Sequence, residues 1–228
     1  YKSASEAGGD WYGYLDLPSE NAMLLILGDV TGHGVGSALV TAASNTFFKT
    51  LELWFDSPDI STEPDKVLEE LNKVIYRSTN GTMAMTMFIL KLHLGDGRVE
   101  YSNAGHNSPY VYRKDPALVK SDKKSKKLSP LILKGSPLGY TPDSTYKKKE
   151  TVVYDGDFMM VFSDGIIECC DPEGQEYGKK RFKTHLEAYQ GQTSEAFIEE
   201  IRTDAYQFFN KDHQEDDITL LMIRVKED

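Results

Sequence analysis

Residues 22–36 read AMLLILGDVTGHGVG and join two different patterns. The first seven residues form an unbroken apolar run, which is typical of a short strand buried on both faces. Asp29 follows this run, and the glycines after it predict a tight loop. From Val35 to Leu51, apolar residues recur at helical spacing. We therefore predict a buried strand, an acidic strand end and a helix in direct succession.

Outward from this stretch, runs of strands are separated from pairs of helices. We expect further strands over 11–15, 84–93, 98–103, 109–113, 151–154, 158–162 and 218–225, and further helices over 64–76, 179–189 and 194–209. Gly95-Asp96-Gly97 and Asp155-Gly156 are turn signals that predict hairpins between the strands beside them. Thr62 and Thr193 are the expected helix caps. Antiparallel neighbours and segregated helices favour an α+β fold over a doubly wound parallel one.

Composition excludes several classes of protein. The chain has 228 residues, is 39% hydrophobic and 27% charged, and carries a net charge of −10. These values indicate a globular domain, and the acidic balance disfavours a nucleic-acid partner. No apolar run reaches the length of a membrane span, so we expect no membrane contact. The two cysteines, Cys169 and Cys170, are adjacent and unsuited to pairing, which favours a cytoplasmic location.

Four aspartates occupy strand ends beside glycine or a second acid. They are Asp10, Asp29, Asp164 and Asp216. Aspartate is a common turn residue, so any one of them is as readily structural as functional. Together they suggest a cluster, and clustered carboxylates repel one another unless a cation lies between them. Oxygen ligands suit Mg²⁺ or Mn²⁺, and a pair of such ions is a typical phosphoryl-transfer centre.

Six motifs in order give these aspartates a wider context. They are GGDWY (8–12), GDVTGHG (28–34), AGHN (104–107), SPLG (136–139), FSDGI (162–166) and DDIT (216–219). This series resembles the SpoIIE/RsbU-type bacterial serine/threonine phosphatases, a branch of the metal-dependent (type 2C) protein phosphatases. The resemblance covers nearly the whole chain. It implies a four-layer α-β-β-α sandwich of two antiparallel sheets flanked by helices.

The resemblance also implies a role for each acid. Asp29 matches the aspartate that bridges two metal ions, and the carbonyl of Val30 matches the next metal contact. Asp164 and Asp216 match the carboxylates that complete the site, and Asp10 matches the acid that orients an activated water. The implied cofactors are two ions of Mn²⁺ or Mg²⁺. The implied reaction is direct attack of that water on phosphorus, without a phosphoenzyme.

The expected substrate is phosphoserine or phosphothreonine on a protein, and by family analogy a STAS-domain anti-anti-sigma factor in a partner-switching pathway. A catalytically silent phosphatase-like domain that binds a partner is the alternative, and a hydrolase of small phosphoesters is a weaker one. We expect residues 1–228 to form a single phosphatase domain from a longer protein with an upstream sensor or regulatory region. The sequence leaves the oligomeric state open, and a dimer is compatible with it.

Other features are open between a structural and a functional role. The eukaryotic branch places a histidine two residues after its bridging aspartate, where this chain has Thr31; His33 is expected to fix the loop, and His106 to hold a turn. No arginine lies between Lys2 and Trp11 to bind substrate phosphate. The 114–134 segment is predicted as a basic loop insertion. With Arg113 it carries eight basic and two acidic residues, and it is either a solubilising surface or a docking patch for an acidic partner.

Overall fold

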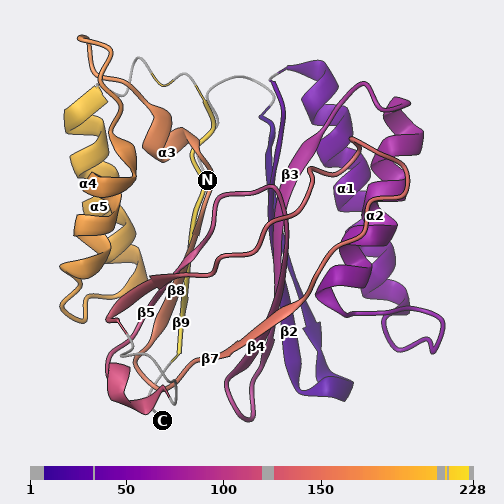
Figure 1. Cartoon of the computed structure of the whole chain (residues 1–228), viewed down its shortest axis with the longest axis horizontal. Helices are drawn as coiled ribbons and strands as arrows, with labels where there is room; N and C mark the ends of the chain where they lie inside the picture. Colours follow the sequence, from indigo (N-terminus) through magenta and orange to yellow (C-terminus); the bar gives the residue numbers. More distant parts are fainter. Residues whose placement is uncertain (1–7, 33, 120–125, 210–213, 215, 226–228) are drawn as a thin grey trace. The chain divides into compact units, whose positions relative to one another are not determined.

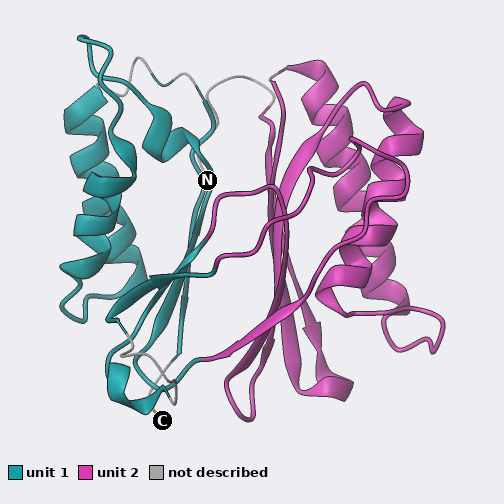
Figure 2. Ribbon diagram, viewed as in Figure 1, with its two compact units in different colours: residues 1–4, 109–131, 153–228 teal, residues 5–108, 132–152 magenta. Residues whose placement is uncertain are grey.

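The structure is a computed structural model that describes residues 8–32, 34–119, 126–209, 214 and 216–225. Its chain divides into two compact units (Figure 2). Unit 2 comprises residues 5–108 and 132–152, and unit 1 comprises 1–4, 109–131 and 153–228. Each unit is one antiparallel sheet with helices packed against it (Figure 1). The two antiparallel sheets and five helices confirm the α+β class predicted from the sequence.

Unit 2 contains a five-stranded sheet in the order β1-β2-β3-β4-β7. Its strands are β1 (Asp10–Leu17), β2 (Ala22–Val30), β3 (Met85–His93), β4 (Arg98–Ala104) and β7 (Lys149–Val152), with the short helix η1 (Pro18–Glu20) between the first two. Helices α1 (Val35–Trp54) and α2 (Pro64–Thr79) cover one face of this sheet (Figure 1). The predicted hairpin around Gly95-Asp96-Gly97 is confirmed, because β3 and β4 pair across it.

The unit 2 core forms where this face meets the two helices. Leu24 and Ile26 of β2 are almost completely buried, as are Phe48 of α1 and Leu71 of α2. Burial of large apolar side chains contributes about 1.5–3 kcal/mol each, so this core holds β2 firmly in register. The predicted cap at Thr62 is wrong, because its hydroxyl donates instead to Glu20 and α2 begins after Glu63 without a side-chain cap.

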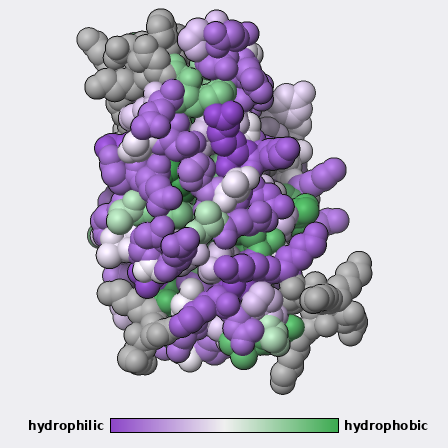
Figure 3. Space-filling view, turned by 90° about the vertical axis from the view of Figure 1, so that its left-hand side faces the viewer, coloured by the Kyte–Doolittle hydropathy of each residue, from purple (hydrophilic) through white to green (hydrophobic). Residues whose placement is uncertain are grey.

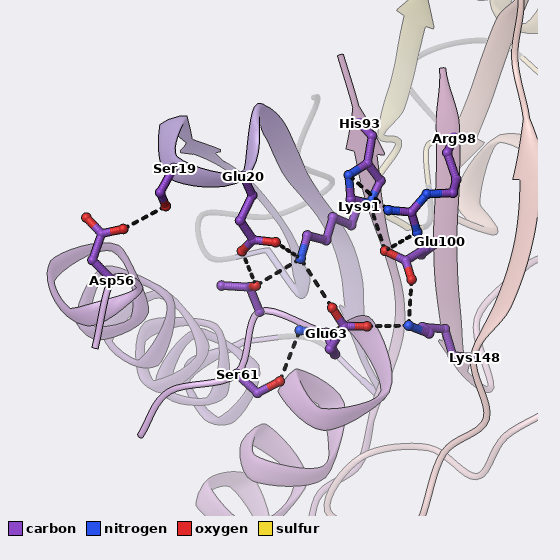
Figure 4. A network of polar contacts seen from close by, with 11 residues as sticks. Ser19, Glu20, Asp56, Ser61, Glu63, Lys91, His93, Arg98, Glu100 and Lys148 are labelled. Atoms are coloured by element: carbon purple, nitrogen blue, oxygen red, sulfur yellow. Dashed lines mark hydrogen bonds and ion pairs between the residues drawn. The ribbon is translucent and has the colours of Figure 1, made fainter. Parts of the chain in front are cut away.

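A network of buried and half-buried charges closes one end of unit 2 (Figure 4). The ammonium of Lys91, 1% exposed, forms ion pairs with Glu20 and Glu63. Glu63 also pairs with Lys148, which in turn pairs with Glu100. Breaking a buried pair leaves an uncompensated charge, so each member depends on the others. The network joins η1, the start of α2, the two strands β3 and β4, and the residue before β7.

Unit 1 contains a four-stranded sheet in the order β6-β5-β8-β9. Its elements are β5 (Tyr110–Tyr112), η2 (Pro116–Leu118), β6 (Leu128–Pro130), β8 (Phe158–Phe162), α3 (Gly165–Glu168), α4 (Gly178–Glu187), α5 (Ser194–Phe209) and β9 (Leu220–Arg224). Aromatic rings fill its core: Phe158 stacks on Tyr112 with centroids 4.7 Å apart, and Phe162 packs against Phe182 at 4.6 Å. The outward face of α4 and α5 is mostly hydrophilic (Figure 3).

Two local predictions in unit 1 have opposite outcomes. Thr193 caps α5 as predicted, since its hydroxyl accepts a hydrogen bond from the amide of Ala196 at 3.2 Å. The predicted hairpin across Asp155-Gly156 is wrong, because β7 pairs with β4 and not with β8. The turn itself exists: the carboxylate of Asp157 accepts from the amides of Tyr154 and Lys114. This turn therefore leads the chain from one sheet to the other.

Neither Cys169 nor Cys170 forms a disulfide in the described part of the chain. The predicted basic segment, 114–134, contains η2 and β6. Its residues 120–125 lie outside the described residues. Among the helices that the structure describes, none combines the length and the apolar character needed to span a bilayer.

The charge network makes stability depend on pH through Glu100. Burial raises the pKa of this carboxyl, but hydrogen bonds from Lys148 and His93 and the nearby charges of Lys148 and Arg98 outweigh burial and lower its pKa to about 2. A lowered pKa means that Glu100 stabilises the fold above the unfolded-state value of 4.5 and that this stabilisation is lost as the pH falls toward 2. We predict that Glu100→Gln is less stable than the parent at pH 7, by about 1–3 kcal/mol.

Urea unfolding at several pH values between 7 and 3 measures this effect. The free energy of unfolding of Glu100→Gln should fall less steeply with pH than that of the parent chain. Glu52→Gln is the matched control, because Glu52 pairs with Lys49 on the exposed surface of α1. If the free energy of unfolding falls equally steeply with pH in the parent and in Glu100→Gln, the ion pairs of Glu100 do not cause the pH dependence.

Candidate metal centre

Asp10 and Asp29 lie side by side at one end of the unit 2 sheet. Asp10 is the first residue of β1, and Asp29 is the eighth of nine in β2. The antiparallel register places them directly opposite each other. Side chains at opposed positions share a face and have Cβ atoms about 4.5–5.5 Å apart, and like charges there destabilise the pair. The fold of unit 2 therefore holds two carboxylates close together at an electrostatic cost.

The backbone around this pair is closely packed. The amide of Val30 donates to the carbonyl of Gly9, at 3.2 Å. A Cβ atom at Gly9 would lie only 3.0 Å from the carbonyl oxygen of Val30, so a residue without a side chain allows this approach. Beyond Asp29, the amide of Thr31 donates to the carbonyl of Ala84 at 2.9 Å. These contacts fix the direction of the chain on both sides of Asp29.

Asp164 and Asp216 lie at one end of the unit 1 sheet, after β8 and before β9. Gly165 brings the two segments together, because a Cβ atom at this position would lie 2.1 Å from the carbonyl oxygen of Asp217. Ser163 links them further. Its hydroxyl donates to the Asp217 carbonyl at 3.3 Å and accepts from the amide of Thr219 at 2.9 Å. Close backbone packing thus holds the second pair of acids.

The chemistry of this pair suits a cation. Asp164 precedes α3 without capping it by its side chain, and its Oδ1 is buried without a hydrogen-bond partner among the described residues. Glu168 lies one helical turn later, and burial raises its pKa, as do the charges of Asp164, Glu176 and Asp216. A buried oxygen that lacks a donor, in a region of like charge, is a favourable position for a hard divalent ion.

Each unit therefore brings together half of the predicted site. In unit 2, Asp10 is opposed to Asp29, which Val30 follows, and in unit 1 Gly165 lies against the backbone of Asp216 and Asp217. No set of three or more His, Cys, Asp or Glu residues in the described part of the chain forms a metal-ligand group. The donors that are present, all of them oxygens, fit Mg²⁺ or Mn²⁺ in kind.

Sequence reasoning missed two contributors, Glu168 and Ser163. Glu168 adds a further acid beside Asp164, and the signal for it was its spacing of four residues from that aspartate. Ser163 had no such signal, since only the fold shows that its hydroxyl joins two segments more than fifty residues apart. Of the two histidines, His33 lies outside the described residues. The side chain of Asn103 holds the backbone at His106 by accepting from the His106 amide at 2.8 Å, and the His106 ring lies 2.9 Å from the hydroxyl of Thr86.

Comparison with known proteins places this geometry in a family. The family model of stage II sporulation protein E (SpoIIE) matches residues 19–226. The phosphoserine phosphatase RsbU of Bacillus subtilis is 26% identical over 171 residues, which are 75% of this chain and 46% of RsbU. The chain thus spans less than half the length of this relative.

Solved structures share the fold. The SiaA-PP2C domain of Pseudomonas aeruginosa superposes with a TM-score of 0.76 at 20% identity, covering 96% of this chain and 81% of that one. RsbX, whose crystal structure holds magnesium, superposes with a TM-score of 0.63 at 16% identity, covering 96% and 88%. Both similarities identify the PP2C fold, and the family match extends over most of the sequence. The chain therefore belongs to the SpoIIE family of PP2C-type phosphatase domains.

Proposed function

We propose that this chain is a metal-dependent phosphatase domain that hydrolyses phosphoserine or phosphothreonine on a protein. The observation that carries the proposal is that a chain of this family has all four acids at strand ends, with Asp10 opposed to Asp29 and the segment after Asp164 packed against the backbone of Asp216. RsbU, its relative, is a phosphoserine phosphatase, which supports the same activity here. RsbX binds magnesium, which supports a divalent cofactor.

In this proposal Asp29, the carbonyl of Val30, Asp164 and Asp216 are the residues that would hold two Mn²⁺ or Mg²⁺ ions. When bound, two such ions lower the pKa of a water molecule and neutralise charge on the phosphoryl oxygens. The carboxylate of Asp10 would accept a hydrogen bond from such a water and orient it.

The same arrangement explains why the acids are held so rigidly. In-line attack requires the reacting atoms to be aligned, and small displacements of a ligand lower the rate strongly. In unit 2 the pairing of β1 with β2 fixes Asp10 against Asp29. In unit 1 the close contact of Gly165 with the Asp217 carbonyl fixes Asp164 against Asp216. We infer that both constraints position carboxylates.

For the natural substrate we propose a phosphorylated STAS-domain anti-anti-sigma factor, as the relationship to RsbU suggests. The domain is then the output part of a longer signalling protein in a partner-switching pathway. A catalytically silent binding domain is the competing hypothesis. The complete set of four acids argues against it, because a domain selected only for binding has no need to hold like charges together.

One prediction of the proposed function concerns the acids themselves. Asp29→Asn should bind Mn²⁺ much more weakly in calorimetry and lose more than about 100-fold in hydrolysis of a phosphoprotein, a larger loss than changes outside the ligand set cause. Asp164→Asn should show the same two losses. Asp16→Asn, on the exposed part of the same strand as Asp10, is the matched control and should keep both properties.

Two results would count against the proposed function. One is parent-level activity with a chelator present, and the other is full Mn²⁺ affinity in Asp29→Asn. A chain that binds Mn²⁺ normally but hydrolyses neither a phosphoprotein nor a chromogenic phosphoester would instead support the silent binding domain.

The second prediction concerns the spacing of Asp164 and Asp216. Gly165→Ala places a methyl group 2.1 Å from the Asp217 carbonyl, so one of the two segments must move. We expect a loss of about 1–3 kcal/mol in stability, which is typical of overpacking, and weaker Mn²⁺ binding in the fraction that remains folded. Gly36→Ala is the control: its new methyl group meets only the flexible end of Met83. Equal Mn²⁺ affinity in the two variants would show that this close contact does not position the acids.

A further inference from the structure

Asn72 is a fully buried polar side chain on the apolar face of α2. The other side chains that this face buries next to it are the hydrophobic residues Leu68, Leu71 and Ile75. Asn72 itself is 0% exposed. Asparagine is a poor helix former, and a buried amide costs free energy unless it is hydrogen-bonded. The contribution of Asn72 to the fold therefore lies in its hydrogen bonds.

Three hydrogen bonds join the side chain of Asn72 to one distant segment. The amide of Gly139 donates to Oδ1 of Asn72 at 2.8 Å. In the other direction, Nδ2 of Asn72 donates to the carbonyls of Thr141 and Pro142, at 2.9 and 3.1 Å. Gly139 is the last residue of the SPLG motif (136–139), which has no part in the proposed metal centre. Asn72 thus fixes the end of this motif to α2.

The segment fixed by Asn72 extends the unit 2 sheet at the end that carries the acids. Leu138, the residue before Gly139, exchanges two backbone hydrogen bonds with Met85, at 2.8 and 3.0 Å. Met85 is the first residue of β3, and in the sheet it is also opposite Val30 of β2. The packing is close, because a Cβ atom at Gly139 would lie 2.7 Å from the carbonyl oxygen of Met83. The backbone at the start of β3 is therefore held between this segment and β2.

The start of β3 in turn fixes a peptide group at the end of β2. The amide of Thr31 donates to the carbonyl of Ala84, one residue before Met85, at 2.9 Å. The carbonyl of Val30 belongs to the same peptide group as this amide. Because a peptide group is planar, the direction of its N–H bond also sets the direction of its carbonyl. Backbone contacts therefore lead from the segment bound by Asn72 to an oxygen that is a proposed metal ligand.

We propose that Asn72 is a positioning residue for the metal centre. It sets the direction of the Val30 carbonyl through residues 138–142 and the start of β3. This inference rests on the proposed function, since it concerns a ligand of the same site. Loss of the three bonds of Asn72 frees Gly139 to move, and the movement passes through β3 to the peptide group between Val30 and Thr31. The result is a weaker metal site in a domain that stays folded.

The test compares Asn72→Leu with the control Ser102→Ala in the 228-residue chain. Leucine keeps the branched shape of asparagine but neither donates nor accepts a hydrogen bond. Asn72→Ser, which retains one donor and one acceptor, is the milder variant if Asn72→Leu does not fold. Ser102 is also fully buried, and its hydroxyl donates to the carbonyl of Lys147 at 2.9 Å. The control therefore removes a bond of the same kind from the middle of the sheet.

Two measurements on folded samples give the result. Hydrogen exchange of the Thr31 amide, followed by NMR with a chelator present, reports on the peptide group itself, and calorimetry reports on Mn²⁺ affinity. We expect exchange at Thr31 to be at least about tenfold faster in Asn72→Leu than in the parent chain, because local opening there becomes easier. Mn²⁺ affinity should fall about 10–100-fold, the range for groups that orient metal ligands. Ser102→Ala should match the parent chain in both measurements.

Two results would overturn the role of Asn72 alone. One is normal Mn²⁺ affinity with unchanged Thr31 exchange in the Asn72 variants. The other is exchange that accelerates equally at Thr31 and at Leu90, in the middle of β3, since a purely structural role predicts this general loss of protection. Absence of Mn²⁺ binding by the parent chain would instead overturn the proposed function, and with it the effect of Asn72 on metal.

Discussion

The fold holds carboxylates of like charge next to one another, at a cost in stability, and the proposed metal chemistry depends on this constraint. Asp10 and Asp29 are opposed across two paired strands, and strand pairing permits no other arrangement once the register is set. Asp164 and Asp216 are brought together by a backbone contact that only glycine allows at position 165. Repulsion of this kind destabilises the free domain and is removed by a cation, so the same geometry that costs stability creates affinity for metal.

The rest of the structure supplies the stability that this arrangement requires. In unit 2 the apolar side chains of β2 pack against α1 and α2, and the charge network around Lys91 and Glu63 ties the other end of the sheet to η1 and α2. In unit 1 packed aromatic rings form the stabilising core between the sheet and helices α4 and α5. Each sheet is thus stabilised by a packed core, in unit 2 also by the charge network, and carries aspartates at one end of its strands.

The sequence predicted what is local and missed what depends on distant partners. The strand and loop around Asp29 follow from an apolar run and glycines, and the acids were found because they interrupt that pattern. The pairing of β7 with β4 was missed, because a turn at Asp155-Gly156 does not reveal which sheet each flanking strand joins. Lys91 was not singled out, because the glutamates that neutralise it are 28 and 71 residues away in the sequence. Helix α3 is too short for its periodicity to show, and with it Glu168 was overlooked.

The most direct test of the central claim is a crystal structure of the domain grown with Mn²⁺, with the ions located by anomalous scattering. The account predicts two Mn²⁺ ions, both within bonding distance of Asp29, with Asp164 and Asp216 completing their ligands and Asp10 facing an oxygen between them. Mn²⁺ ions bound only at other carboxylates, or a site from which Asp29 is absent, would contradict it.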